Sequence, residues 1–164
     1  MKTLFMLTIF FTVLISLNAD DRQAQIKEMQ QYLKDNGCVE YQDYLRIGTD
    51  PKENKLDLFW YATKILLVPD YILVRKGFIF FIEVKGTNKL KAEDYYKIQE
   101  MAFKGSKYNE VKVGIMYFAH KDAEPVWIDH NKLYDYWIDP RIPMKYYPEL
   151  DFQGNKKAYK EIPV

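Results

Sequence analysis

The sequence predicts an α/β fold in which a mixed central sheet of four to six strands has helices on both faces. Two apolar runs with a hairpin pattern are followed by a helical pattern and then by an apolar strand, Val111–Phe118. A strand, a helix and a strand in succession predict a parallel pair joined by a right-handed crossover. The strand-like runs are apolar almost without interruption, which is typical of a sheet covered on both faces.

The hairpin pattern consists of the runs Tyr71–Val74 and Phe78–Ile82, with Lys76-Gly77 between them. β-Branched and aromatic runs that are split by a Gly-containing dipeptide are typical of a hairpin with a two-residue loop. We therefore expect Lys76 and Gly77 to form the loop. A bulged loop is the alternative, and it would shift the pairing by one residue.

The two-residue loop fixes which residues face each other across the hairpin. Arg75 is expected to face Phe78, and counting back along both strands places Asp70 opposite Glu83. Side chains alternate along a strand, so Lys85 lies on the same face as Glu83. The open end of the hairpin thus brings two carboxylates and one ammonium to one spot.

This group of charges favours a metal site. Two carboxylates about 5 Å apart repel each other by roughly 3 kcal/mol at an effective dielectric of about 20. Lys85 can offset the charge of Asp70 or of Glu83, but not of both. A divalent cation, which prefers oxygen ligands, would resolve the imbalance.

The same residues resemble the motif of a nuclease superfamily. Pro69-Asp70, followed by Glu83-Val84-Lys85 at the end of an apolar strand, is similar to the PD-(D/E)XK superfamily. Its members include restriction endonucleases, Holliday-junction resolvases and RecB-type exonuclease domains. The resemblance covers about Val68–Phe103. Two other Glu-x-Lys tripeptides, Glu53–Lys55 and Glu110–Lys112, lack the Pro-Asp on a partner strand.

The resemblance implies a restriction-endonuclease-like core and a metal-dependent endo- or exonuclease that hydrolyses phosphodiester bonds of nucleic acid, with DNA as the expected substrate. Asp70, Glu83 and the Val84 carbonyl would hold Mg²⁺ or Mn²⁺, which lowers the pKa of a bound water. Lys85 would orient or deprotonate the attacking water and stabilise charge in the transition state.

A helix is expected from about Lys89 to Lys104, with Asn88 as its cap. Gln99 lies on the apolar stripe that should pack on the sheet. Gln99-x-x-x-Phe103 resembles the Gln-x-x-x-Tyr pattern of RecB-type nucleases, which implies that Gln99 supports the site or contacts substrate. The alternative is a structural Gln whose amide bonds to a backbone carbonyl, and the sequence leaves both open.

The net charge of the chain is +1, so no global basic signal indicates a nucleic-acid-binding protein. Local lysines must provide any such surface. Lys89 and Lys91 are nearest to the Glu-x-Lys strand, and we expect them to contact phosphates. For Lys97 and Lys107 we expect a solvated helix face.

One feature departs from the superfamily pattern. Its members often place an acidic residue of the first helix near the metal. In the expected helix Asp21–Lys34 the internal candidate is Glu28, which lies opposite the apolar stripe, and this puts a second metal in doubt. One alternative is a catalytically inactive module on the same fold that binds nucleic acid or protein. Another is a secreted or membrane-associated protein of unrelated activity.

The first 19 residues have the pattern of a secretory signal peptide. Met1-Lys2-Thr3 carries one positive charge, and the 14-residue run Leu4–Leu17 has no charge. This run is shorter than the ~20 residues that a spanning helix needs. We expect residues 1–19 to be a targeting segment, with membrane contact through residues 4–17, and residues 20–164 to form a single domain. The protein would then be secreted or membrane-associated, and otherwise cytoplasmic. The alternatives are an uncleaved anchor and an N-terminal extension that is not part of the mature protein.

Further elements are expected from composition and apolar pattern. We expect the run Leu56–Leu67 to be the strand next to the hairpin and the Pro- and Tyr-rich segment Asp139–Pro148 to be irregular. The tail Asn155–Val164 would close a sheet edge or touch substrate. The remaining expected elements are strands at Tyr41–Ile47 and Pro125–Ile128 and a short helix at Leu133–Trp137.

Overall fold

The computed structural model describes residues 27–40, 42–46, 69–120 and 122–164. The chain divides into two compact units, Met1–Gly37 and Cys38–Val164. In the first unit, residues 27–35 are helical, and Met29 and Leu33 of the predicted apolar stripe are buried. The predicted helix therefore exists in the described part and extends one residue past its expected end.

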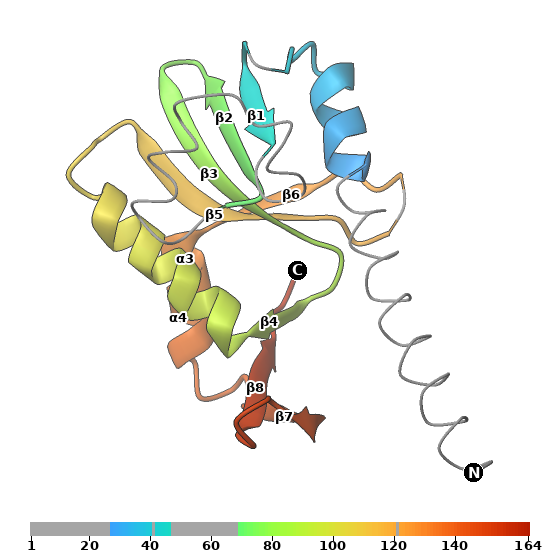
Figure 1. Cartoon of the computed structure of the whole chain (residues 1–164), viewed down its shortest axis with the longest axis vertical. Helices are drawn as coiled ribbons and strands as arrows, with labels where there is room; N and C mark the ends of the chain where they lie inside the picture. The colour runs from blue at the N-terminus through green and yellow to red at the C-terminus, as the bar shows by residue number, and fades with distance from the viewer. Residues whose placement is uncertain (1–26, 41, 47–68, 121) are drawn as a thin grey trace. The chain divides into compact units, whose positions relative to one another are not determined.

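The second unit contains a mixed five-stranded sheet with the order β1-β2-β3-β5-β6 (Figure 1). β3 and β5 are parallel, and the other neighbours are antiparallel. This arrangement confirms the predicted α/β class and the crossover between the Glu-x-Lys strand and the next strand. The strands are β1 (Tyr44–Arg46), β2 (Tyr71–Arg75), β3 (Phe78–Lys85), β5 (Val111–Tyr117) and β6 (Val126–Asp129).

The turn between β2 and β3 has the predicted two-residue loop. Lys76 and Gly77 both have positive φ, 51° and 79°, as a type I′ hairpin turn requires. Arg75 pairs with Phe78, and the register continues without a shift to Tyr71 and Ile82. The bulged alternative is therefore excluded.

Two helices of this unit are described, α3 (Ala92–Gly105) and α4 (His130–Ile138). Ile98 and Met101 of α3 and Leu133 of α4 belong to one buried cluster with Val113 and Ile115 of β5. Because residues 113 and 115 alternate with 114, both helices pack on the same face of the sheet. This packing places α3 on β5, so its side chains can reach the neighbouring strand β3, where the predicted site lies.

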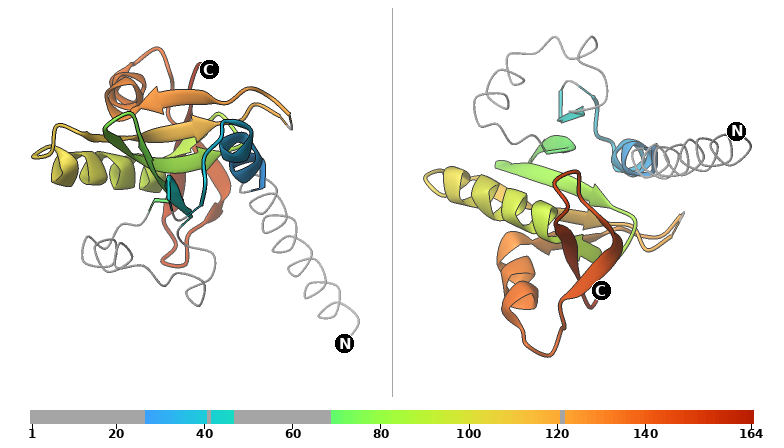
Figure 2. Two further views of the ribbon diagram at one scale, coloured as in Figure 1. Left: turned by 90° about the horizontal axis from the view of Figure 1, so that it is seen from above. Right: turned by 60° about the horizontal axis from the view of Figure 1, so that its bottom comes forward.

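A second, three-stranded antiparallel sheet was not predicted. Its order is β4-β8-β7, with β4 at Lys89–Lys91, β8 at Lys156–Glu161 and β7 at Lys145–Leu150 (Figures 1 and 2). The expectation that Asp139–Pro148 is irregular is wrong for its last residues, because they pair with β8. The tail forms β8, which is the central strand of this second sheet and not a sheet edge.

The expected start of the crossover helix is also wrong. Lys89–Lys91 pairs with β8, so the helix begins at Ala92, and its N-cap residue Lys91 makes no side-chain cap. The Asn88 side chain donates to the carbonyl of Ile162 instead of capping a helix. Pairing with a distant strand has overridden a local helical pattern.

The outcomes for the other expected strands and the expected short helix are as follows. The strand that pairs with β2 opposite β3 is β1, at Tyr44–Arg46. The run Leu56–Leu67, expected as a strand next to the hairpin, lies outside the described residues. The strand expected at Pro125–Ile128 is present as β6 and the helix expected at Leu133–Trp137 as the longer α4.

The charge-free run at residues 4–17 is outside the described residues too, and its targeting role stays a prediction. No helix in the described residues is long and apolar enough to cross a membrane.

The turn geometry predicts how its two residues respond to substitution. Gly77→Ala should lower the free energy of unfolding by about 1–2 kcal/mol, because a side chain at positive φ is strained. The effect is conformational, since a Cβ at Gly77 would meet nothing within 4 Å. Gly77→Asn, which tolerates this conformation, should recover most of the loss in denaturant unfolding. A Gly77→Ala protein as stable as the wild type would contradict the turn.

Candidate functional site

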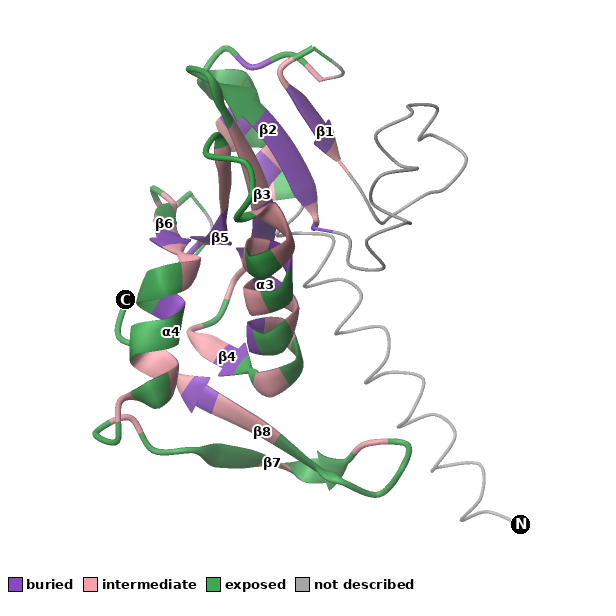
Figure 3. Ribbon diagram, turned by 90° about the vertical axis from the view of Figure 1, so that its left-hand side faces the viewer, coloured by how far each residue is buried: buried purple, intermediate pink, exposed green. Residues whose placement is uncertain are grey.

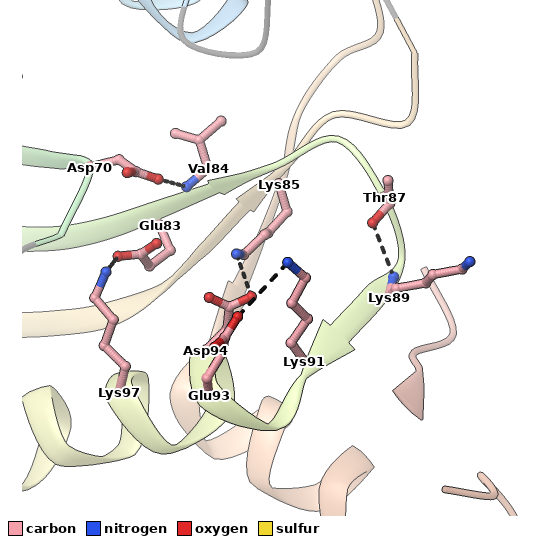
Figure 4. A network of polar contacts seen from close by, with 10 residues as sticks. All are labelled: Asp70, Glu83, Val84, Lys85, Thr87, Lys89, Lys91, Glu93, Asp94 and Lys97. Atoms are coloured by element: carbon pink, nitrogen blue, oxygen red, sulfur yellow. Dashed lines mark hydrogen bonds and ion pairs between the residues drawn. The ribbon is translucent and has the colours of Figure 1, made fainter. Parts of the chain in front are cut away.

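Asp70 is held against the end of β3 by a backbone hydrogen bond. Its Oδ2 accepts from the Val84 N–H at 2.9 Å (Figure 4). Asp70 directly precedes β2, and the pairing of Tyr71 with Ile82 places it opposite Glu83 one step further along. The structure therefore brings Asp70 beside Glu83 and Val84.

The carbonyl of Val84 points to the same edge of β3 as its N–H. The Lys85 carbonyl accepts from Phe118 on the β5 side, and backbone groups of successive strand residues point to opposite edges. The N–H and C=O of Val84 therefore face the β2 side. Extending the register places Pro69 opposite Val84, and proline has no N–H to donate. Pro69 thus cannot occupy this carbonyl with a sheet hydrogen bond.

Glu83 is a buried carboxylate, with 4% of its surface exposed. Burial and, to a smaller extent, the neighbouring Asp70 charge raise the pKa of Glu83, Lys97 opposes both effects, and the net pKa is about 7. Lys97 of α3 donates to Glu83 Oε1 in an ion pair (Figure 4). Glu83 therefore exchanges a proton near neutral pH in the metal-free protein.

Lys85 is paired with α3 as well. Its Nζ donates to Asp94 Oδ2 at 2.6 Å. Two residues along a strand span about 6.7 Å and three along a helix about 4.5 Å. The long lysine side chains span the difference, so Glu83 and Lys85 of β3 pair with Lys97 and Asp94 of α3. The result is two parallel ion pairs between β3 and α3 (Figure 4).

These pairs correct two expectations about charge. We expected Lys85 to offset the charge of Asp70 or of Glu83; its charge does lower the pKa of Glu83, but Lys97 makes the ion pair with that carboxylate. We also expected Lys97 to lie on a solvated helix face, and this was wrong, because its side chain reaches across to β3.

Asp94 and Lys97 are therefore residues of the site that sequence reasoning missed. The signal was present at Asp94, which lies one helical turn before the buried Ile98. A charged residue on a stripe that faces the sheet needs a charged partner there.

The Gln99 side chain makes its hydrogen bond outside this group of charges. Its Nε2 donates to the His130 carbonyl at 2.9 Å and so joins α3 to the first residue of α4. This is the kind of bond that the structural alternative predicted. A supporting role of Gln99 in catalysis stays a prediction.

Lys89 and Lys91 lie on the second sheet, which begins four residues after Lys85. The Nζ of Lys89 lies over two tyrosine rings of that sheet. Lys91 Nζ is 3.8 Å from Glu93 Oε1 in an exposed pair. Their phosphate contacts stay a prediction.

The donors at this site fit Mg²⁺ or Mn²⁺. Within the described ranges, no three or more His, Cys, Asp or Glu side chains are grouped to hold a metal ion. The Asp70 and Glu83 carboxylates and the Val84 carbonyl are nevertheless all hard oxygen donors. Mg²⁺ is commonly bound by one or two carboxylates and keeps several waters, so this set is sufficient for such an ion.

Comparison with known proteins gives little for this chain. No protein-family model and no curated protein matches the sequence. Among solved structures, a Holliday junction resolvase of the archaeal hyperthermophile Archaeoglobus fulgidus matches 72% of this chain and 74% of its own, with 12% identity and a TM-score of 0.33. A likeness at this level assigns neither a family nor a function.

The raised pKa of Glu83 predicts a pH-dependent stability. A carboxyl whose pKa is about 7 in the folded protein and about 4.3 in the unfolded chain binds its proton more tightly when folded. Its contribution is fully present below about pH 4.3 and is lost as pH rises through 7. Glu83→Gln should therefore reduce the decline of the unfolding free energy over this window, by up to about 4 kcal/mol.

The measurement is urea unfolding at several pH values without divalent metal. Glu100→Gln is a control, because Glu100 is exposed and pairs with Lys104 on the surface of α3. A decline that is as steep in Glu83→Gln as in the wild type would contradict the raised pKa.

The Gln99 bond predicts a structural effect. Gln99→Ala should lower the free energy of unfolding by about 1 kcal/mol or more, because the half-buried His130 carbonyl loses its donor. Gln42→Ala, at an exposed side chain, serves as the control. Unchanged stability together with lower nucleic-acid cleavage would instead favour the supporting role in catalysis.

Proposed function

We propose that the protein is a divalent-metal-dependent nuclease that hydrolyses phosphodiester bonds of nucleic acid, with DNA as the expected substrate. The observation that carries this proposal is the placement of Asp70 against Val84, beside the buried Glu83, with Lys85 on the same face. Two carboxylates, one of them buried, with lysines beside them are typical of a site that binds a cation and a phosphate together.

Asp70, Glu83 and the Val84 carbonyl would hold the metal. The bound Mg²⁺ or Mn²⁺ would lower the pKa of a coordinated water and so supply the nucleophile. The Val84 N–H keeps Asp70 at the edge of β3, and Pro69 leaves the Val84 carbonyl available there. Each ligand is thus positioned by the backbone of the hairpin.

Lys85 would stabilise negative charge on the phosphate as the bond to the leaving oxygen breaks. Asp94 holds its ammonium at 2.6 Å, so the cation is positioned before substrate arrives. A charge that is oriented in advance requires little reorganisation during the reaction, which is how such groups lower a barrier.

Lys97 neutralises Glu83 in the metal-free protein. A divalent cation must therefore compete with an ammonium, and near neutral pH also with a proton, for the same carboxylate. Metal binding should weaken as pH falls below about 7 for this reason.

A second candidate function is a binding module on the same fold without catalysis. Glu83 and Lys85 are both in ion pairs with α3, and the described residues hold no third acidic side chain in a metal-binding group. Such internally paired charges also occur in structural networks. Metal binding and cleavage, measured separately, distinguish the two functions.

The first variant removes a metal ligand. Asp70→Asn should abolish Mn²⁺ binding and leave the stability of the metal-free protein unchanged or slightly higher. Asn keeps an oxygen that can accept from Val84, and the repulsion with Glu83 is removed. Calorimetric Mn²⁺ titration at pH 8 measures the binding, with Asp135→Asn on the exposed surface of α4 as the control. Normal Mn²⁺ binding by Asp70→Asn would contradict the metal site.

The second variant removes the phosphate-facing cation. Lys85→Met should bind Mn²⁺ but lose at least 100-fold in cleavage, roughly the effect of removing one charge-stabilising donor. Nicking of plasmid and degradation of single-stranded DNA and RNA are the measurements, with Lys132→Met on α4 as the control. Wild-type protein that binds Mn²⁺ and cleaves none of these substrates would favour the binding module.

A further inference from the structure

One face of the second sheet is rich in lysine and tyrosine. Residues that pair directly across a sheet share a face, so the pairs of Lys91 with Tyr159, Lys145 with Tyr159 and Lys89 with Glu161 define this face. Lys157 is two residues before Tyr159, and Tyr147 lies under the Lys89 ammonium. We call this set the Lys–Tyr face: Lys89, Lys91, Lys145, Lys157, Tyr147, Tyr159 and Glu161.

The Lys–Tyr face is the open side of the sheet. Leu90 and Ile162, which alternate with its residues, are both 2% exposed and belong to the main core. The strands β7 and the start of β8 are largely exposed (Figure 3). The opposite side of the sheet near β4 is therefore the packed one.

The lysines of this face outnumber their acidic partners. Two of the four lysines are paired, Lys145 with Glu161 at 2.5 Å and Lys91 with Glu93 at 3.8 Å. The excess of two positive charges comes from Lys89 and Lys157, in a chain whose net charge is +1. A polyanion is the ligand that this charge complements.

Lys89 is held in place by aromatic rings. Its Nζ is 5.2 Å from the ring centroid of Tyr159 and 5.8 Å from that of Tyr147, and the two rings are 4.5 Å apart. Each such cation–π contact stabilises by about 0.5–1 kcal/mol at an exposed site. The tyrosines thus orient the ammonium and remain half-exposed beside it.

The Lys–Tyr face adjoins the candidate active site. β4 starts four residues after Lys85, and Lys91 reaches Glu93, which is next to the Asp94 that pairs with Lys85 (Figure 4). Burial raises the pKa of Tyr147, and the charge of Asp94 adds to this, which supports the proximity. A nucleic-acid chain bound at the candidate active site can therefore continue onto the Lys–Tyr face.

We propose that the Lys–Tyr face binds a single strand of nucleic acid that extends from the candidate active site. The lysines would contact its phosphates, and the rings of Tyr147 and Tyr159 would meet unpaired bases. Proteins that bind single strands combine these two elements, a positive surface and aromatic rings for base stacking. A duplex keeps its base faces stacked inside, so it would use the charge alone. The inference rests on the proposed function for its ligand.

Binding without cleavage tests this proposal. Fluorescence anisotropy would follow a labelled thymidine oligonucleotide of roughly 20 nucleotides, longer than one typical site, and the matching duplex. All titrations omit divalent metal and cover a series of salt concentrations. We expect the wild type to bind the single strand more tightly than the duplex.

The lysine variants test the charge. Lys89→Gln and Lys157→Gln should each weaken single-strand binding about fivefold and lower the slope of log K against log salt by about 0.7. Lys132→Gln is the matched control, because Lys132 also lies over a tyrosine ring, at 5.0 Å from that of Tyr136, but on α4. It should bind as the wild type does.

The tyrosine variants test the stacking. Tyr147→Leu should weaken single-strand binding and leave the salt slope unchanged, because no phosphate contact is lost. Tyr147→Phe keeps the ring and should bind as the wild type does, which separates a lost ring from a misfolded sheet. Equal binding of duplex and single strand would overturn the proposal, as would lysine variants that behave like Lys132→Gln. If the single-strand preference and the variant effects are found but the protein cleaves nothing when Mg²⁺ or Mn²⁺ is present, only the proposed nuclease activity is overturned.

Discussion

The pairing register of β2 and β3 is the constraint on which the candidate site depends. The turn at Lys76 and Gly77 sets this register, and Asp70 reaches Glu83 only because no residue is inserted along the way. A slip by one residue would place Asp70 opposite Ile82 or Val84, whose side chains lie on the other face. The chemistry at the open end of the hairpin is thus determined by two residues at its closed end.

Burial of Glu83 adds a second constraint on how α3 lies on the sheet. A buried carboxylate without a partner is strongly unfavourable, and Lys97 provides the partner. The apolar residues Ile98 and Met101 fix the packing of the helix, while the two ion pairs to Glu83 and Lys85 add a register along its axis. The same contacts that orient α3 therefore keep the charges of the site in place.

The sequence predicts the parts of this structure that depend on local signals. The Lys76-Gly77 turn and the apolar run of β5 are read from adjacent residues, so the hairpin and the parallel crossover are predicted correctly. The partners of Lys85 and Glu83 depend on the placement of α3 over β3, which no local pattern contains. β4 also depends on a distant partner. The local sequence pattern of Lys89–Lys91 predicts a helix, and these residues form a strand because they pair with the C-terminal β8.

The two sheets differ in how their charges are paired. At the site, Glu83 and Lys85 are each paired with a side chain of opposite charge on α3. On the Lys–Tyr face the lysines outnumber their acidic partners by two, and the chain as a whole has a net charge of +1. Fields from exposed charges are screened within about 10 Å at 0.1 M salt. The lysines of the Lys–Tyr face can therefore attract a phosphate chain at short range, although the protein as a whole is nearly neutral.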